Sequence, residues 1–128
     1  MLKKTITYTD FNGEKREEDF YFHFSRAEIL EKELSVEGGL GAMLRRIINA
    51  QDMPSLMKLF KELVLDAYGE KSPDGKRFIK SEELKTAFAQ TEAYSILFTK
   101  LATDDEAAAE FFNALIPEEP EQKKPDVE

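Results

Sequence analysis

Apolar and polar residues alternate in the first part of the chain, and this pattern predicts β-strands. Segment 5–9, TITYT, combines β-branched and aromatic residues with a period of two. Segment 20–24, FYFHF, places phenylalanine at every second position, so these rings share one face. Asn12 and Gly13 lie between the segments and form the pair that a type I′ turn prefers, because both of its central residues need positive φ. We therefore predict a β-hairpin over residues 1–24.

The sequence leaves the pairing register of this hairpin open. A two-residue turn would place Ile6 opposite Asp19 and Tyr8 opposite Glu17, which sets apolar side chains against acidic ones. A bulge or a longer loop would shift that register. We therefore predict the hairpin and leave its register undecided.

Helical spacing of apolar residues begins at Ser25. Ser25 and Glu28 match a capping box, in which the hydroxyl and the carboxylate satisfy each other's free backbone N–H groups. A narrow apolar stripe then runs to about Ser35. It consists of Ala27, Leu30 and Leu34. The glycine pair at 38–39 interrupts the pattern, and a second helix extends to about Ala50.

Start signals mark the remaining helices. Asp52 can cap a third helix, which carries the widest apolar face and stops near Gly69. Ser81 can cap a fourth helix, and the next apolar stretch either continues it or restarts near Thr91. A second capping box at Thr103 opens the last helix.

These elements predict one α+β, mainly helical domain over residues 1–116. The chain has 128 residues, which is within the usual size of a single domain. The β-hairpin at 1–24 would pack on about five α-helices in 25–116. Residues 117–128, PEEPEQKKPDVE, combine prolines and charged residues with almost nothing apolar. That composition predicts a disordered acidic tail.

Composition narrows the partners and the compartment. The formal net charge of -8 at pH 7 argues against nucleic acids and anionic membranes, since both require a basic surface. There is no cysteine, which excludes a thiolate metal site and a cysteine nucleophile. No apolar run approaches the roughly 20 residues of a membrane span, and the start of the chain shows no signal-peptide core. We therefore expect a cytoplasmic protein.

No catalytic or metal-binding pattern emerges from the residues. His23 lies in an aromatic strand, without a nucleophile partner recognisable from spacing. Segment 72–83, SPDGKRFIKSEE, has the length of a calcium loop. However, Lys76 stands at the fifth place, and Arg77 stands at the sixth, which requires glycine. We expect no enzymatic activity, no metal and no cofactor.

The residues favour protein binding over catalysis as the function, because there are more apolar residues than a small core needs. The chain contains 10 phenylalanines and 4 methionines, and methionine is common at adaptable binding surfaces. A groove lined by such residues could accept an amphipathic helix, and an exposed strand of the hairpin offers a second route by edge pairing. The candidate contact residues, chosen from this surplus, are Phe20, Phe22, Met53, Met57, Tyr94 and Phe98.

Three segments resemble the tail assembly chaperones of long-tailed bacteriophages. They are 6–14 (ITYTDFNGE), 68–84 (YGEKSPDGKRFIKSEEL) and 90–98 (QTEAYSILF), and the overall resemblance covers about residues 1–116. It implies a holdase that binds the long, helical tape measure protein, keeps it soluble and helps bring tail tube subunits around it. It also implies several copies per tape measure protein, leaves self-association open, and places the chaperone in the host cytoplasm and outside the mature virion. Many members of the family occur in a longer frameshifted form, and the proline-rich segment 117–128 looks like the linker at such a switch.

Two other classes of function remain open. A small acidic inhibitor or decoy would bind a basic surface of a host protein, and salt would then control its affinity. The chaperone interpretation predicts instead that truncating apolar side chains matters more than salt. A small enzyme or calcium sensor is a weaker alternative, since the calcium loop is interrupted and no nucleophile–base set is present.

Overall fold

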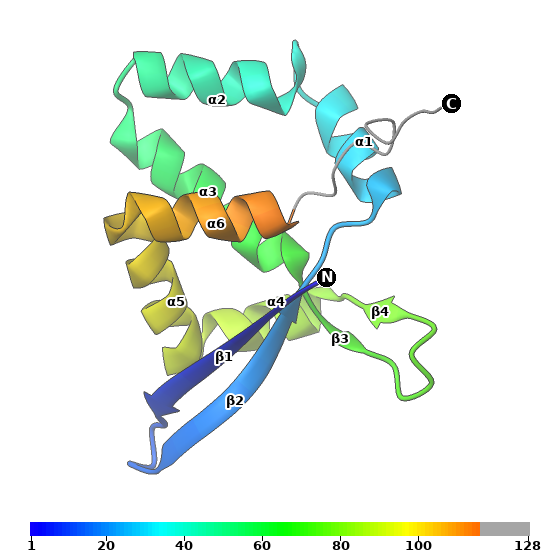
Figure 1. The fold of residues 1–128 in the computed structure, drawn as a ribbon, viewed down its shortest axis with the longest axis vertical. Coiled ribbons are helices and arrows are strands. Elements are labelled where there is room, and N and C mark those ends of the chain that lie inside the picture. Colours follow the sequence, from blue (N-terminus) through cyan, green and yellow to red (C-terminus); the bar gives the residue numbers. More distant parts are fainter. Residues whose placement is uncertain (116–128) are drawn as a thin grey trace.

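A four-stranded antiparallel sheet and six helices form the part of the chain that the structure describes (Figure 1). The structure, a computed structural model, describes residues 1–115, apart from the side chains of Leu44 and Ile48. The strands, in sheet order, are β1 (Leu2–Thr9), β2 (Lys15–Phe22), β3 (Tyr68–Lys71) and β4 (Phe78–Ile79). The helices are α1 (Arg26–Leu34), α2 (Gly39–Asn49), α3 (Met53–Ala67), α4 (Glu82–Ala89), α5 (Glu92–Thr103) and α6 (Asp105–Leu115). The predicted α+β, mainly helical class is confirmed, whereas the predicted tail at 117–128 lies outside the described residues.

The β1–β2 hairpin pairs in a register that collects its apolar side chains on one face. Ile6 lies opposite Glu18 and Tyr8 opposite Arg16, one residue away from the pairing of a two-residue turn. Because successive side chains alternate between the faces of a sheet, this shift puts Ile6 and Tyr8 on the same face as Phe20. The Tyr8 and Phe20 rings lie 6.4 Å apart.

The turn of the hairpin explains the register. Gly13 N–H donates to the Asp10 carbonyl at 2.9 Å, and Asp10 N–H donates to the Glu14 carbonyl at 2.8 Å. Gly13 has φ +85°, whereas Asn12 is not in the positive-φ region, so the predicted type I′ turn is wrong. The turn is type I, followed by a glycine bulge that adds the extra residue. The Asp10 carboxylate fixes it by accepting from the backbone N–H groups of Asn12 and Glu14, each at 2.9 Å.

Strands β3 and β4 were missed by the sequence interpretation, which assigned Tyr68 to the end of the third helix. β3 follows α3 directly and pairs with β2 through Tyr68 and Gly69. β4 then pairs with Glu70 and Lys71 of β3. A turn at 72–75, closed by a hydrogen bond from Gly75 N–H to the Ser72 carbonyl at 2.9 Å, joins these two strands. The sheet is therefore shared between the N-terminal hairpin and the segment between α3 and α4.

Most helix starts follow the predicted caps. The Ser25 hydroxyl accepts from Glu28 N–H at 3.1 Å, while Ser25 N–H donates to the Glu28 carboxylate at 2.8 Å, which completes the capping box. Asp52, Ser81 and Thr91 each accept from a backbone N–H three residues later. The stretch after α4 therefore restarts at Thr91, and this makes six helices in the described residues.

The last predicted cap is wrong by one residue. The Thr103 hydroxyl donates to the Thr99 carbonyl at 2.7 Å and so belongs to the end of α5. Asp104 takes its place, because its carboxylate accepts from Glu106 N–H and Ala107 N–H, each at 3.1 Å. A carboxylate at this position also favours the positive end of the helix dipole.

The core lies between the inner face of the sheet and helices α3 to α6. Phe22, on β2, is fully buried and packs edge-on against Phe88 of α4 and Phe111 of α6, with ring centroids 5.7 and 5.3 Å apart. Tyr68 stacks on Phe88 at 4.2 Å. Helices α1 and α2 lie toward the end of the molecule opposite the tip of the β1–β2 hairpin (Figure 1).

Candidate functional site

An apolar pocket of about 200 Å³ lies between α1, α2, α3 and α6. We call it the four-helix pocket. Its lining residues are Phe24, Ile29, Lys32, Leu40, Gly41, Leu59, Phe60, Leu63, Phe112 and Leu115. Lys32 is the one charged side chain among them. A pocket of this character can bury apolar groups and offers almost no polar group for chemistry.

The walls of the pocket come from the half of α3 that the core does not use. The C-terminal half of α3 contributes buried residues, including Val64 and Ala67, to the core. Leu59 and Phe60, about a turn earlier, are only partly buried. Phe60 packs on Phe112 of α6, with ring centroids 4.9 Å apart, and the two rings form one side of the pocket.

Helix α1 closes another side of the pocket without entering the core. It has no buried residue, and Ile29 is its apolar contact with the pocket. The predicted stripe on α1 instead faces solvent, with Leu30 58% and Leu34 78% exposed. Met53, at the start of α3, is 55% exposed. Large apolar side chains thus stand in solvent on two helices that wall the pocket.

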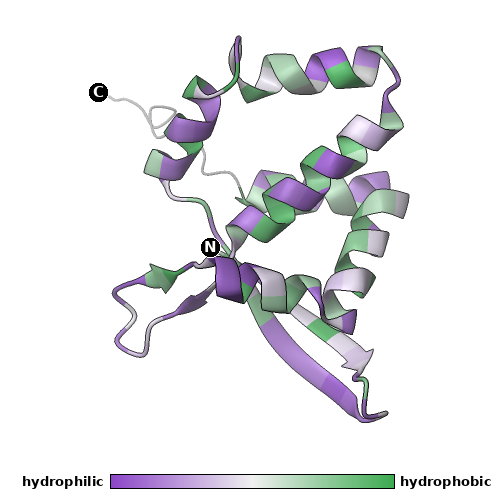
Figure 2. Ribbon diagram, turned by 180° about the vertical axis from the view of Figure 1, so that it is seen from behind, coloured by the Kyte–Doolittle hydropathy of each residue, from purple (hydrophilic) through white to green (hydrophobic). Residues whose placement is uncertain are grey.

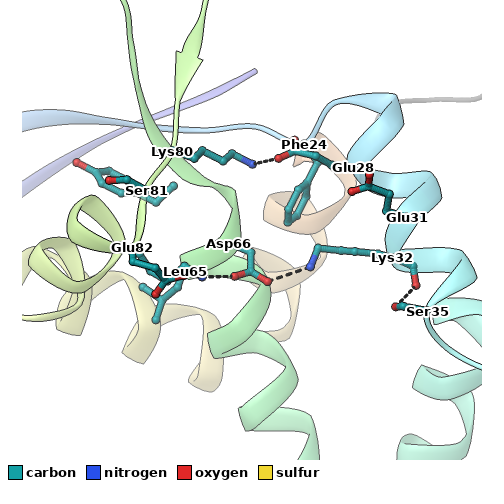
Figure 3. A pocket seen from close by; sticks show the side chains of 12 residues that line it. Phe24, Glu28, Glu31, Lys32, Ser35, Leu65, Asp66, Lys80, Ser81 and Glu82 are labelled. Carbon is teal, nitrogen blue, oxygen red and sulfur yellow. Dashed lines mark hydrogen bonds and ion pairs between the residues drawn. The ribbon is translucent and has the colours of Figure 1, made fainter.

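A charged cleft of about 500 Å³ adjoins the pocket and shares Phe24 and Lys32 with it (Figure 3). Asp66, near the end of α3, accepts from Lys32 of α1 at 2.9 Å and from Lys85 of α4 at 2.7 Å. Partial burial raises the pKa of Asp66, but the hydrogen bonds from Lys85 and Lys32 together hold it below its usual value. Asp66 is therefore charged at neutral pH and ties α1 and α4 to α3.

A second ion pair fixes the start of α1. Lys80 donates to Glu28 at 2.9 Å, as Figure 3 shows. The Lys80 and Lys32 ammonium groups also lie over the Phe24 ring, 4.7 and 5.4 Å from its centroid. Helix α1 is therefore held by charged side chains around one buried ring, together with Ile29, which packs against the core.

The single histidine, His23, lies in an aromatic environment. Burial, and then the positive N-terminus and Lys80, lower the pKa of His23, so its ring is neutral at pH 7. The ring meets Phe78 edge-on at 5.7 Å, which is a packing contact. Within residues 1–115, no group of three or more His, Cys, Asp or Glu residues is placed to hold a metal ion. The helices of this region are also too short or too polar for any of them to cross a membrane.

The six predicted contact residues fall into three places. Phe20 and Phe22 belong to the core, where both pack on Phe88. Phe22 has no exposed surface, whereas Phe20 also lines an opening between β2 and β3. Phenylalanine on the inner face of the sheet is required by the core, because the helices cover this face. Met53 is exposed, and Met57, one turn later on α3, is half-buried.

Tyr94 and Phe98 form a separate pair on α5. Their rings stack with centroids 5.8 Å apart, and both side chains are half-buried. Neither lines the four-helix pocket. The pocket residues that the prediction missed include Leu59, Phe60 and Phe112. For Leu59 and Phe60, the signal was the apolar face of the third helix, which was wider than one core contact needs.

The described residues form a small α+β fold with an apolar pocket between four helices. A family model described as phage tail assembly chaperone matches residues 1–126. The chain therefore belongs to the phage tail assembly chaperone family. No curated protein and no solved structure matches it.

Proposed function

We propose that this tail assembly chaperone binds an amphipathic helical segment of the tape measure protein in the four-helix pocket. Binding would keep that segment soluble while tail tube subunits are brought around it. The observation that carries the proposal is an apolar, partly open pocket on a protein of this family. An amphipathic helix that lays its apolar face into a hydrophobic groove is a recurring mode of recognition.

The size of the pocket fits one large side chain. A cavity of about 150 Å³ lined by Leu, Ile and Phe is enough to bind benzene. The four-helix pocket, at about 200 Å³, is therefore wide enough for a phenylalanine or leucine of the partner. It is smaller than the roughly 300–1,000 Å³ of small-molecule sites, which favours a protein side chain over a free ligand.

The exposed stripe on α1 would extend this contact. Leu30 and Leu34 are separated by one helical turn and so lie on the same face of α1. A partner helix has apolar residues at a matching spacing of three or four positions. One of its residues would fill the pocket while its neighbours cover the two leucines.

The charge of the chain supports a role as a soluble carrier. A net charge of -8 disperses copies of the protein and its complexes by mutual repulsion. Binding would occur without chemical reaction, in the host cytoplasm, and the chaperone would leave before the virion is complete. Several copies along one tape measure protein would use the same pocket repeatedly.

Co-expression with the tape measure protein of the same phage tests this function. The soluble fraction is separated by size-exclusion chromatography in about 1 M NaCl, where charges are screened beyond about 3 Å. We expect a soluble tape measure protein that co-elutes with the chaperone. If the tape measure protein stays insoluble and the chaperone elutes alone, the proposal is wrong.

A matched pair of variants tests the site. Leu59→Gln puts an amide into the wall of the pocket, while Ile96→Gln makes the same change at an exposed position on α5. We expect Leu59→Gln to release the tape measure protein and Ile96→Gln to retain it. If both variants hold the tape measure protein equally well at unchanged melting temperatures, the pocket is not the binding site.

A further inference from the structure

A second opening lies where the two hairpins of the sheet separate. β3 pairs with β2 only through Gly69 with Tyr21 and Tyr68 with Phe22, and then turns away toward β4 (Figure 1). Within the described residues, no strand covers this side of β2 over 15–20. A concavity of about 590 Å³ fills the gap, lined by residues 18–21 of β2 and 68–71 of β3. We call this opening the strand fork.

Backbone groups of β2 point into the strand fork. Asp10 N–H donates to the Glu14 carbonyl, and hydrogen-bonded pairs alternate along an antiparallel ladder, so the even-numbered residues of β2 bond to β1. The odd-numbered residues then direct their N–H and C=O groups to the other side. His23 follows this rule, since its N–H donates to Ala67 at 2.9 Å on that side. Of the residues on this unpaired edge, Asp19 lines the strand fork, and Glu17 and Lys15 continue the edge toward the hairpin tip.

Acidic side chains surround these groups. Glu17, Glu18 and Asp19 follow one another on β2, and Glu70 lies on β3. This half of β2 is coloured as strongly hydrophilic in Figure 2. The pKa of Tyr68 is raised by burial and then by the negative charges of Glu70 and Glu18, in keeping with a negative potential in the opening.

Two cations near the strand fork, Arg16 and Lys71, make contacts within the fold, whereas Lys15 makes no ion pair with the described residues. Arg16 donates to Asp10 at 2.5 Å and lies 3.5 Å from Glu18. The Lys71 ammonium lies over the Tyr21 ring, 4.7 Å from its centroid. The acids therefore dominate the charge that an incoming chain would meet.

We propose that the strand fork takes an extended, basic segment of a partner protein as an added β-strand beside β2. The backbone of that segment would pair with Glu17 and Asp19. Its outward side chains, lysine or arginine, would lie beside the acids of β2, and its inward side chains would pack toward Phe20 and Tyr68, whose rings are 6.4 Å apart. Strand addition of this kind takes its affinity from backbone pairing and its specificity from alternate side chains.

The free edge of β1 does not suit the same partner. Lys3 and Lys4 lie on it, and lysine on an edge strand discourages further pairing. A basic segment would be repelled there and attracted to the strand fork. The proposal concerns a surface separate from the four-helix pocket and does not depend on the tape measure protein.

The test uses the full chain and two synthetic peptides of about eight residues, a common strand length. One peptide alternates Val and Lys, and the other alternates Val and Glu. We expect the Lys peptide to shift the NMR amide signals of Glu17 and Asp19 and to slow their hydrogen exchange, with binding that weakens as salt rises. Equal binding of the Glu peptide, or binding that leaves these two amides unchanged, would overturn the proposal.

Two proline variants locate the added strand. Glu17→Pro removes an N–H that points away from β1, so it deletes no hydrogen bond of the β1 ladder, although the proline ring also fixes φ at this position. Thr7→Pro is the matched control, since Thr7 faces the free edge of β1 by the same alternation. We expect Glu17→Pro to weaken binding by about tenfold or more and Thr7→Pro to change it by less than about twofold. The reverse result would contradict the strand fork as the site.

Two further outcomes are decisive. If Glu17→Pro fails to fold, two versions of the Lys peptide replace it, one N-methylated at the odd backbone nitrogens and one at the even ones. We expect one of these two peptides not to bind, because its methyl groups replace the N–H groups that pair with β2. Retained binding of both peptides would refute strand addition. If the unbound chain self-associates and Glu17→Pro abolishes that association, the occupant is a second copy of this chain, and the proposal of a basic partner is wrong.

Discussion

Lys32 of α1 and Asp66 of α3 are 34 residues apart in the sequence, yet the ammonium and the carboxylate lie 2.9 Å apart. This contact helps to place α1, which has no fully buried residue and is also held by the Lys80–Glu28 ion pair and by Ile29 against the core. Lys32 and Ile29 also line the four-helix pocket. The ion pair therefore links the stability of the fold to the shape of the pocket.

Replacing Asp66 by Asn is expected to lower the free energy of unfolding by about 1–2 kcal/mol at pH 7, because two charge-assisted hydrogen bonds are weakened at a partly exposed site. The pKa of Asp66 is lowered in the folded protein, so its stabilising effect is complete above the unfolded value of about 3.9 and is lost as pH falls through the folded value. The gap between wild type and Asp66→Asn should therefore close in strong acid. Urea unfolding across that pH range measures it.

Glu62→Gln provides the control for Asp66→Asn. Glu62 lies on the same helix, is exposed, and makes no ion pair with the described residues. Its substitution should change stability by less than about 0.5 kcal/mol at any of these pH values. An equal loss in both variants would mean that the net charge of α3, and not the Asp66 pairing, is responsible.

Gly69→Ala is expected to destabilise the protein by about 1–3 kcal/mol, as overpacking does. A Cβ at Gly69 would lie 2.6 Å from the Ile79 carbonyl oxygen and 2.6 Å from the Phe78 ring. The oxygen belongs to the backbone, so β4 itself would have to move. Gly41→Ala is the comparison, because its Cβ would meet only ordinary contacts on α2, and it should stabilise the helix by about 0.5–1 kcal/mol. Thermal melting of both variants should show shifts of opposite sign.

The sequence predicted those features that depend on neighbouring residues. The caps at Ser25, Asp52 and Ser81 are hydrogen bonds over three positions, and their donors and acceptors are fixed by local geometry. Thr103 and Asp104 show the limit of this reasoning. Both can cap a helix, and only the conformation at the end of α5 decides that the carboxylate does so.

Features that depend on distant residues were not predictable in the same way. The pairing of Gly69 with Tyr21 joins segments far apart in the chain. The four residues of β3 begin directly after α3 and are too few to show the alternation of apolar and polar residues that predicts a strand. The four-helix pocket requires the placement of four helices at once. In the sequence, its residues are indistinguishable from core positions. Phe22 is fully covered by packed elements, whereas Phe60 lines the pocket, and this difference depends on where the helices lie.

Phe22→Ala tests the assignment of this residue to the core. Phe22 has no exposed surface, so truncation should cost about 3–5 kcal/mol through lost burial and a residual cavity. Phe11→Ala removes the same ring from the hairpin turn, where it is 81% exposed, and should cost less than about 0.5 kcal/mol. Equilibrium unfolding in urea distinguishes the two. A small effect at Phe22 would contradict its place in the core and return it to the set of contact residues.

The exposed leucines of α1 give a prediction that separates binding from folding. Replacing Leu30 and Leu34 by Ser should change the free energy of unfolding by less than about 0.5 kcal/mol for each, because both side chains already stand largely in solvent. If the proposed partner helix covers them, affinity for the tape measure protein should fall by about tenfold or more, as loss of a buried apolar anchor does. Phe11→Ser is the control, because Phe11 is also largely exposed but lies at the tip of the hairpin. Titration of the wild type and the purified variants against a soluble tape measure fragment measures these affinities. Equal affinity of the wild type, the leucine variants and Phe11→Ser would show that α1 is not part of the binding surface.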